Sequence, residues 1–302
     1  MTKLVLERPI ICIAGPTASG KTDYAVQIAK KVDGEVVNAD ALQVYADISI
    51  LSARPSNAEM DDIPHHMFGH VPGGTFYSTG DWLRDALKVF EDIDQRGKIA
   101  VLVGGTGLYF QALLNGLADV PEVEASIIED IEPLSVNDLR EEAESVDPVA
   151  AARILGDDPQ RLGRIVGVFR STGRPLSEWQ ADTQPSILAP DIKRAVLLPE
   201  RDTLYQRINR RFDMMMDVGA LEEAQGVHKK NHPKRAPMLK AIGLSHLLSH
   251  LDGECDLETA IETAKRDSRR LAKRQMTWFR NRCADWTVLF DQTQKDDFLA
   301  EL

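Results

Sequence analysis

The chain has 302 residues, of which 43% are hydrophobic and 27% are charged, and its formal net charge at pH 7 is −11. This length predicts one large domain or two, with enough apolar side chains for a sizeable core. No apolar run approaches the roughly 18 residues that span a bilayer, so we do not expect an integral membrane protein. The 3 cysteines are widely spaced, which argues against a disulfide scaffold and predicts a cytoplasmic location.

The charge is unevenly distributed along the chain. Residues 201–282 contain 17 basic and 11 acidic side chains, whereas residues 121–147 contain ten acids and a single arginine, Arg140. The total charge alone argues against a nucleic-acid partner, because phosphates repel a negative surface. The basic C-terminal third argues the other way, because a local cationic face can bind phosphates whatever the total is.

The first third of the chain alternates strand and helix patterns. Short apolar runs at residues 10–14, 35–39 and 98–103 predict buried strands. Helical patterns follow the first and third runs, and a further one covers residues 79–95, with Ser78 or Thr79 as its N-cap. This alternation predicts right-handed crossovers and a parallel sheet.

The strand pattern disappears between residues 121 and 185, where helical pieces are separated by prolines. It returns at residues 192–198, and a last strand is expected at 286–290. We therefore expect an α/β fold in which residues 1–120 and 186–302 form the core and C-terminal helices. Residues 121–185 are expected to form a small all-helical insertion domain.

The sharpest motif is GPTASGKT, a full match to G-x-x-x-x-G-K-[ST] between the first strand and the following helix. Its backbone N–H groups and the helix N-terminus favour phosphate, Lys21 adds a positive charge, and Thr22 can hold Mg²⁺. This predicts the P-loop NTPase-like, nucleotide-binding type of sheet also found in ATP-binding proteins. The expected diphosphate-binding residues are Gly15, Pro16, Thr17, Ala18, Ser19, Gly20, Lys21 and Thr22.

The third strand leads into Gly104-Gly105-Thr106-Gly107 rather than into the acidic residue that would support Mg²⁺ in a kinase. This turn offers N–H groups and a hydroxyl to a second set of phosphate oxygens. The alternative is a tight strand–helix turn that simply requires glycine.

The second strand is followed by Asp40, which would face the same crevice as the phosphate loop. It could bind Mg²⁺, accept a proton from an acceptor substrate, or be a plain helix cap. The amide of Gln43 nearby could read the edge of a base.

Two C-terminal segments place arginines on one helical face. Arg207 and Arg211 are four residues apart, so one could reach a developing pyrophosphate charge, although a salt-bridged helix face is the alternative. On a later helix one stripe about 100° wide collects Arg266, Arg269, Arg270, Lys273 and Arg280. Such a face fits a nucleic-acid backbone.

Nine motifs in this order resemble the tRNA dimethylallyltransferases, also called isopentenyltransferases, of the bacterial type. They cover most of residues 10–290, and the most specific of them is AKRQMTWFR in combination with NADALQVY and VGGTGLY. The matching stretches are GPTASGKT (15–22), NADALQVY (38–45), IPHH (63–66), VGGTGLY (103–109), DPVAAARI (147–154), DPQRLGRIVGVF (158–169), RINRRFDMM (207–215), KAIG (240–243) and AKRQMTWFR (272–280).

The resemblance implies transfer of a dimethylallyl group from dimethylallyl diphosphate to N6 of the adenine 3′ of the anticodon in tRNA. It implies that Asp40 is the general base and that the phosphate loop holds the diphosphate of the donor. Thr106 and Arg211 would hold the pyrophosphate leaving group together with Lys21, and Thr22 would hold the cofactor Mg²⁺. We expect a monomer, and the alternative function is a P-loop small-molecule kinase.

The resemblance also implies tRNA contacts in three regions and on the basic helix. These residues are Asp40, Ala41, Leu42, Gln43, Gln160, Arg161, Leu162, Gly163, Arg164, Lys240, Arg270, Lys273 and Arg274. The chain departs from many family members at Ala41, Leu244 and Leu271, where serine or tyrosine is common.

Overall fold

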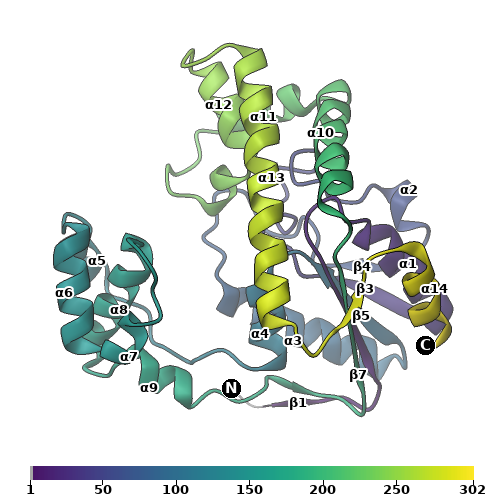
Figure 1. The fold of residues 1–302 in the computed structure, drawn as a ribbon, viewed down its shortest axis with the longest axis horizontal. Coiled ribbons are helices and arrows are strands. Elements are labelled where there is room, and N and C mark those ends of the chain that lie inside the picture. Colours follow the sequence, from purple (N-terminus) through teal and green to yellow (C-terminus); the bar gives the residue numbers. More distant parts are fainter. Residues whose placement is uncertain (1–2) are drawn as a thin grey trace. The chain divides into compact units, whose positions relative to one another are not determined.

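The protein is described by a computed structural model that covers residues 3–302. The chain divides into two compact units (Figure 1). The larger unit contains Leu4–Phe110 and Ile187–Leu302, and the smaller one contains Gln111–Ser186 together with Lys3. The division near the insertion thus falls inside helix α4, Gly107–Leu114, earlier than the residue 121 expected from the sequence.

The larger unit is built on a six-stranded sheet with the order β4-β3-β5-β2-β7-β8, in which all neighbouring strands are parallel. A separate parallel pair joins β1 and β6. Apolar patterns predict the strands of three or more residues, whereas two-residue strands are too short to give a periodic signal. The strands are β1 (Leu4–Val5), β2 (Ile10–Ala14), β3 (Gly34–Asn38), β4 (His65–His66), β5 (Ile99–Gly104), β6 (Ile187–Leu188), β7 (Ile192–Leu197) and β8 (Thr287–Leu289).

Helices surround this sheet, and the predicted helix 79–95 is confirmed as α3. Its N-cap is Ser78, whose side chain accepts a hydrogen bond from Asp81 N in a capping box. The helices of this unit are α1 (Lys21–Val32), α2 (Asn57–Met60), α3 (Thr79–Gln95), α10 (Arg201–Asp217), α11 (Ala220–Lys229), α12 (Leu244–Leu251), α13 (Leu257–Arg282) and α14 (Gln292–Ala300), with the 3-10 helix η1 (Pro237–Lys240) and the first half of α4.

The regular elements within Gln111–Ser186 of the smaller unit are helices joined by irregular segments, and the sequence predicts helices for this region. Its core contains Leu139, Leu162, Ile165 and Val166. Two of the prolines that interrupt the helical pattern, Pro148 and Pro159, stand at the first positions of helices, where a missing N–H costs nothing. The helices are α5 (Ala125–Ile131), α6 (Val136–Val146), α7 (Pro148–Ala151), α8 (Pro159–Thr172) and α9 (Leu176–Ala181).

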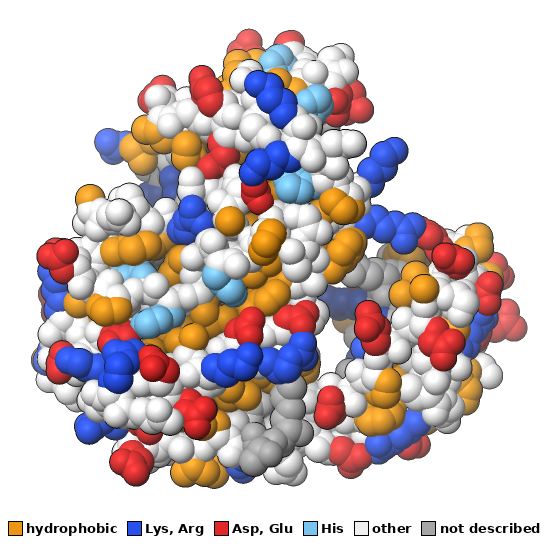
Figure 2. All heavy atoms as spheres, turned by 180° about the vertical axis from the view of Figure 1, so that it is seen from behind, with side chains coloured by type: hydrophobic (Ala, Val, Ile, Leu, Met, Phe, Trp, Pro, Cys, Tyr) orange, Lys and Arg blue, Asp and Glu red, His pale blue; other side chains and the backbone are white. Residues whose placement is uncertain are grey.

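On the face drawn in Figure 2, acidic and basic side chains are interspersed with each other and with exposed hydrophobic side chains. Within residues 3–302, every helix is too short or too polar to cross a membrane.

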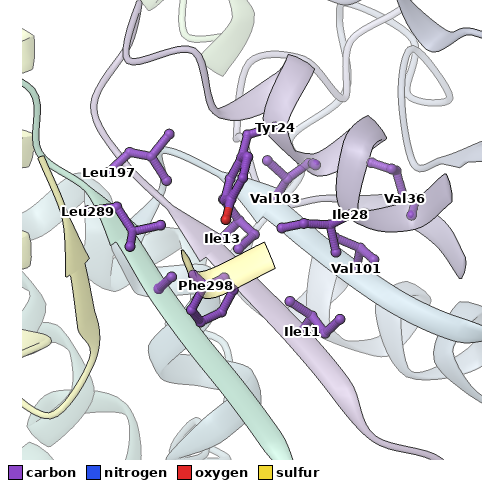
Figure 3. Packing of buried hydrophobic residues seen from close by; sticks show 13 residues of the cluster. Ile11, Ile13, Tyr24, Ile28, Val36, Val101, Val103, Leu197, Leu289 and Phe298 are labelled. Atoms are coloured by element: carbon purple, nitrogen blue, oxygen red, sulfur yellow. The ribbon is translucent and has the colours of Figure 1, made fainter. Parts of the chain in front are cut away.

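One face of the sheet packs against α1 and α14. Successive side chains of a strand point to opposite faces, so Ile11 and Ile13 of β2 point the same way. They belong to a buried cluster with Tyr24 of α1, Leu289 of β8 and Phe298 of α14 (Figure 3). The C-terminal helix is therefore anchored in the core of the larger unit.

Candidate active site

The phosphate loop connects β2 to α1, so the eight residues expected to bind diphosphate lie together at the carboxyl end of the central strand. Its turn needs left-handed backbone at Ala18 (φ 61°) and Gly20 (φ 82°). The conformation at Ala18 costs about 1 kcal/mol, which the surrounding loop has to offset. Ser19 is 1% exposed, and its Oγ has no hydrogen-bond partner among the described residues.

Lys21 reaches back over the loop, where its Nζ donates to Pro16 O at 3.2 Å. Lys21 and Thr22 both line a cavity of about 490 Å³, which we call the outer cavity. Burial lowers the pKa of Lys21 to about 8, Asp40 acts against this shift, and Arg211 adds to it. An anion in the loop would restore the positive charge.

Asp40 follows β3 in a turn held by the buried side chain of Asn38. Asn38 Oδ1 accepts from Asp40 N at 2.9 Å, and its Nδ2 donates to Asp40 O and Met67 O at 3.1 and 3.0 Å. Asp40 Oδ1 accepts from Leu42 N at 3.0 Å. Oδ2 lies on the side of Gly105 and is left available to a substrate proton.

Thr106 follows the neighbouring strand β5 and is bonded directly to the Asp40 turn. Its Oγ1 accepts from Ala41 N at 2.9 Å, and its N donates to Ala39 O at 3.1 Å. The hydroxyl proton therefore remains free to donate to a phosphate oxygen. A Cβ on Gly104 would lie 2.0 Å from Ala39 O, so only glycine permits this approach of the two strand ends.

Arg211 connects the outer cavity to a second one of about 370 Å³, which we call the inner cavity. The inner cavity contains Asp40 and Thr106 and has an apolar wall. Arg211 donates to Ala53 O at 3.2 Å, and burial lowers the pKa of its guanidinium, with Glu59 and Asp40 opposing the shift. The apolar wall is formed by Leu51, Ile208, Phe212, Met215, Ile242 and Leu271.

Gln275 of α13 is a site residue that the spacing of charges does not reveal. Its Oε1 accepts from Thr17 N, and its Nε2 donates to Gly105 O, both at 3.0 Å. One side chain thus joins the phosphate loop to the turn after β5. In the sequence Gln275 stands within the AKRQMTWFR motif (272–280), but its residue type and spacing alone assign it no role.

Helix α13 has the predicted cationic face, but not every residue of the predicted stripe is exposed on it. Arg270, Lys273 and Arg274 are exposed, and Arg270 pairs with Asp267 at 2.9 Å. Arg269 is instead half-buried and bonded to Asn209. Among the described residues Lys273 and Arg274 form no ion pair, so their charges are available to a partner.

The other residues expected to contact tRNA differ in how far their side chains are exposed to solvent. The Leu162 side chain is 0% exposed in the core of the smaller unit, so only its backbone is placed where it could contact tRNA. Its neighbours on α8, Gln160, Arg161 and Arg164, are exposed, and Lys240 is exposed at the end of η1. The amide of Gln43 donates to Ser52 O and Ala53 O at 3.2 and 2.8 Å, so its donors organise the loop.

Comparison with known proteins decides the family. Residues 43–282 match the family described as IPP transferase, and residues 9–67 match isopentenyl transferase. A tRNA dimethylallyltransferase of Rhizobium johnstonii is 43% identical over 280 residues, which cover 91% of this chain and 94% of the relative. The chain belongs to the tRNA dimethylallyltransferase family.

Solved structures agree with this assignment. A tRNA isopentenylpyrophosphate transferase from Bacillus halodurans is similar with a TM-score of 0.70 and 33% identity, covering 98% of this chain and 97% of that one. A eukaryotic dimethylallyltransferase acting on tRNA is similar with a TM-score of 0.83 and 28% identity, covering 98% of this chain and 77% of that one.

The three departures from the family pattern fall at different kinds of position. Ala41 contributes its backbone N–H, which any residue supplies. Leu244 is fully buried, so it affects packing. Leu271 lines the inner cavity, where it extends the apolar wall.

Proposed function

We propose that the protein transfers a dimethylallyl group from dimethylallyl diphosphate to N6 of the adenine on the 3′ side of the anticodon in tRNA. Family membership makes it a prenyltransferase that acts on tRNA. The observation that carries the chemistry is the placement of Asp40 Oδ2, Thr106 and Arg211 around one cavity beside the phosphate loop.

The donor side of the site suits a diphosphate bound to an apolar group. The loop N–H groups, Lys21 and Arg211 offer positive charge where charge grows on the departing pyrophosphate. The hydroxyl of Thr106 can donate to the same oxygens. The apolar wall of the inner cavity accommodates a short hydrocarbon chain next to this polar end.

The acceptor side suits an exocyclic amine. The lone pair of adenine N6 is delocalised into the ring, so a carboxylate that accepts its proton assists formation of the C–N bond. Leu42 N holds Oδ1 of the carboxylate and Asn38 holds the backbone of Asp40, which leaves Oδ2 for the substrate proton. The base would have to leave its stack to reach the inner cavity.

Thr22 would hold the Mg²⁺ that the family implies. Its hydroxyl lies at the start of α1 and lines the outer cavity, and Mg²⁺ favours such oxygen ligands together with substrate phosphates. Within residues 3–302 no group of three His, Cys, Asp or Glu side chains could hold a metal by itself, so the ion would depend on the diphosphate. When bound, it would neutralise part of the diphosphate charge.

A single chain supplies every group named above, which supports a monomer as the working form. The three cysteines are free and two of them are buried, which supports a location in the reducing cytoplasm.

The test combines the protein with labelled dimethylallyl diphosphate, Mg²⁺ and unmodified tRNA. We expect label in the RNA, located by nuclease digestion to the adenine beside the anticodon. A parallel reaction with labelled ATP and no tRNA examines the kinase alternative. Label that stays out of RNA, with ATP turned over instead, would contradict the proposal.

A further inference from the structure

The outer cavity holds more positive charge than the residues discussed so far account for. Besides Lys21 and Arg211, it is lined by Arg207, Arg210 and Lys295. Two acids, Asp23 and Glu59, also line it, yet among the described residues none of the five cations forms an ion pair with either of them. Unpaired cations around one cavity indicate a site for an anion.

Lys295 stands out among these cations because it comes from α14, beyond the stretches that match the family descriptions, which end at residue 282. It is the only basic residue of this helix, which also contains Asp296 and Asp297. Its Nζ would lie 4.0 Å from a Cβ placed on Gly20, the residue that caps α1 at the end of the phosphate loop. The single cation of an acidic helix is thus the one beside the loop.

The backbone that carries Lys295 is fixed by contacts that do not involve its ammonium group. Tyr24 Oη donates to Lys295 O at 2.7 Å, and Lys31 Nζ donates to Leu299 O. Phe298 is 5% exposed in the core cluster shown in Figure 3. The ammonium itself lies 5.8 Å from the centre of the Tyr24 ring, a cation–π contact that leaves its N–H donors free.

We infer that Lys295 is a further anion-binding residue of the site and contacts the distal phosphate of the diphosphate donor and of the pyrophosphate product. This inference rests on the proposed function for the identity of its ligand. The reacting carbon belongs near Asp40 and Thr106 in the inner cavity. Lys295 lines the outer cavity and not the inner one. The outer cavity therefore receives the remote end of the diphosphate.

The environment of the ammonium agrees with this role. Burial lowers the pKa of Lys295, and the nearby Arg207 acts in the same direction, whereas Asp23 and Asp296 oppose it. A bound anion would relieve this repulsion between cations. Because donor and product both carry the distal phosphate, Lys295 should strengthen their binding alike and affect KM rather than kcat.

The experiment measures the affinity of the whole protein for inorganic pyrophosphate by calorimetry in magnesium buffer, without tRNA. We expect Lys295→Met to weaken binding about 3- to 10-fold and Lys295→Arg to retain most of it, because the charge is half-exposed. Lys88→Met, which removes an equal charge from the exposed surface of α3, is the matched control and should bind as the unmodified protein does.

Transfer assays on tRNA complete the test. We expect Lys295→Met to raise the KM for dimethylallyl diphosphate by the same factor, with kcat within about twofold. Equal pyrophosphate affinity in Lys295→Met and the unmodified protein would overturn the inference and leave the proposed function standing. Weakened pyrophosphate binding in a protein that transfers no label to tRNA would instead retain the anion site and reject the proposed function.

Discussion

The two oxygens of Asp40 serve different purposes. Oδ1 holds the turn through Leu42 N, and Oδ2 faces the inner cavity. Asp40→Asn keeps the size and an acceptor oxygen, so we expect the turn to persist. Loss of the base should lower kcat by about 10²- to 10⁴-fold while tRNA affinity changes less than about twofold. Single-turnover transfer and filter binding measure the two quantities, and full activity in this variant would rule out the general-base role.

The lowered pKa of Lys21 predicts how donor binding depends on pH. Its ammonium group is charged below its pKa of about 8 and neutral above it, and only the charged form attracts a diphosphate. The last ionisation of a phosphate ester lies near pH ~6, so the donor itself is constant over this range. We expect the KM for dimethylallyl diphosphate to rise several-fold between about pH 7 and pH 9.

Lys21→Arg is the matched variant, because arginine stays charged at every pH of the assay. Its KM should be flat over the same interval, whatever its absolute activity. A rise of equal size in both proteins would show that another group titrates.

At the residue scale, the sequence predicted which groups lie around the cavities better than it predicted their hydrogen-bond partners. Asp40, Thr106, Arg211 and the loop meet around joined cavities as the motifs predicted. The burial of Leu162 depends on how the helices of the smaller unit pack, and the bonds of Gln43 depend on the path of the loop that follows it, so neither could be predicted from a pattern of residue types. Periodicity assigns a face to a side chain but not a partner.

Helix α13 presents different chemistry on its two faces. Gln275 and Leu271 lie on the side of the inner cavity, whereas Lys273 and Arg274 are exposed. The bonds of Gln275 to Thr17 N and Gly105 O hold the phosphate loop and the turn after β5 at a fixed separation. Helix α13 therefore contributes to the wall of the inner cavity on one side and exposes cations on the other.

Replacing Gln275 by Met keeps its length and removes both hydrogen bonds. We expect kcat/KM to fall about 10-fold or more, because misplacement of the loops by a fraction of an ångström disturbs the aligned reactants. Thr277→Ala, on an exposed turn of the same helix, is the control and should be neutral. Steady-state kinetics with saturating tRNA provides the measurement. An unchanged kcat/KM in Gln275→Met would show that the two turns keep their positions without these hydrogen bonds.

Elements with long periodic patterns were predicted well. The patterns located β2, β3, β5, β7, β8 and α3, including the capping residue Ser78. Strand β4 was missed because two residues carry no period, and the contribution of α14 was missed because its apolar anchor, Phe298, has no meaning until the sheet is formed. Local patterns define elements, whereas docking depends on the whole fold.

The net charge of −11 belongs to the whole molecule and conceals the cations of α13. Most of the surface should repel RNA, so tRNA binding should depend on a few exposed cations and weaken steeply with salt. We expect replacement of Lys273 and Arg274 by Ala to raise the KM for tRNA and to reduce the slope of log affinity against log salt by about one per residue. The KM for dimethylallyl diphosphate should stay unchanged.

Filter binding at a series of salt concentrations measures this slope. The control replaces Lys88, whose charge lies on the exposed surface of α3. A slope that the double substitution leaves unaltered would place the RNA on another surface.

The strand order has a consequence for the dimensions of the reaction. Asp40 follows β3, Thr106 follows β5 and the phosphate loop follows β2, and these three strands are consecutive in the sheet. Neighbouring strands lie about 4.8 Å apart, so the turn that holds Asp40 and the phosphate loop are separated by roughly two such intervals. Under the proposed function, the acceptor amine and the donor diphosphate would be bound at the two ends of this span. The backbone hydrogen bonds of the sheet fix this separation, so substitutions on the surface should leave it unchanged.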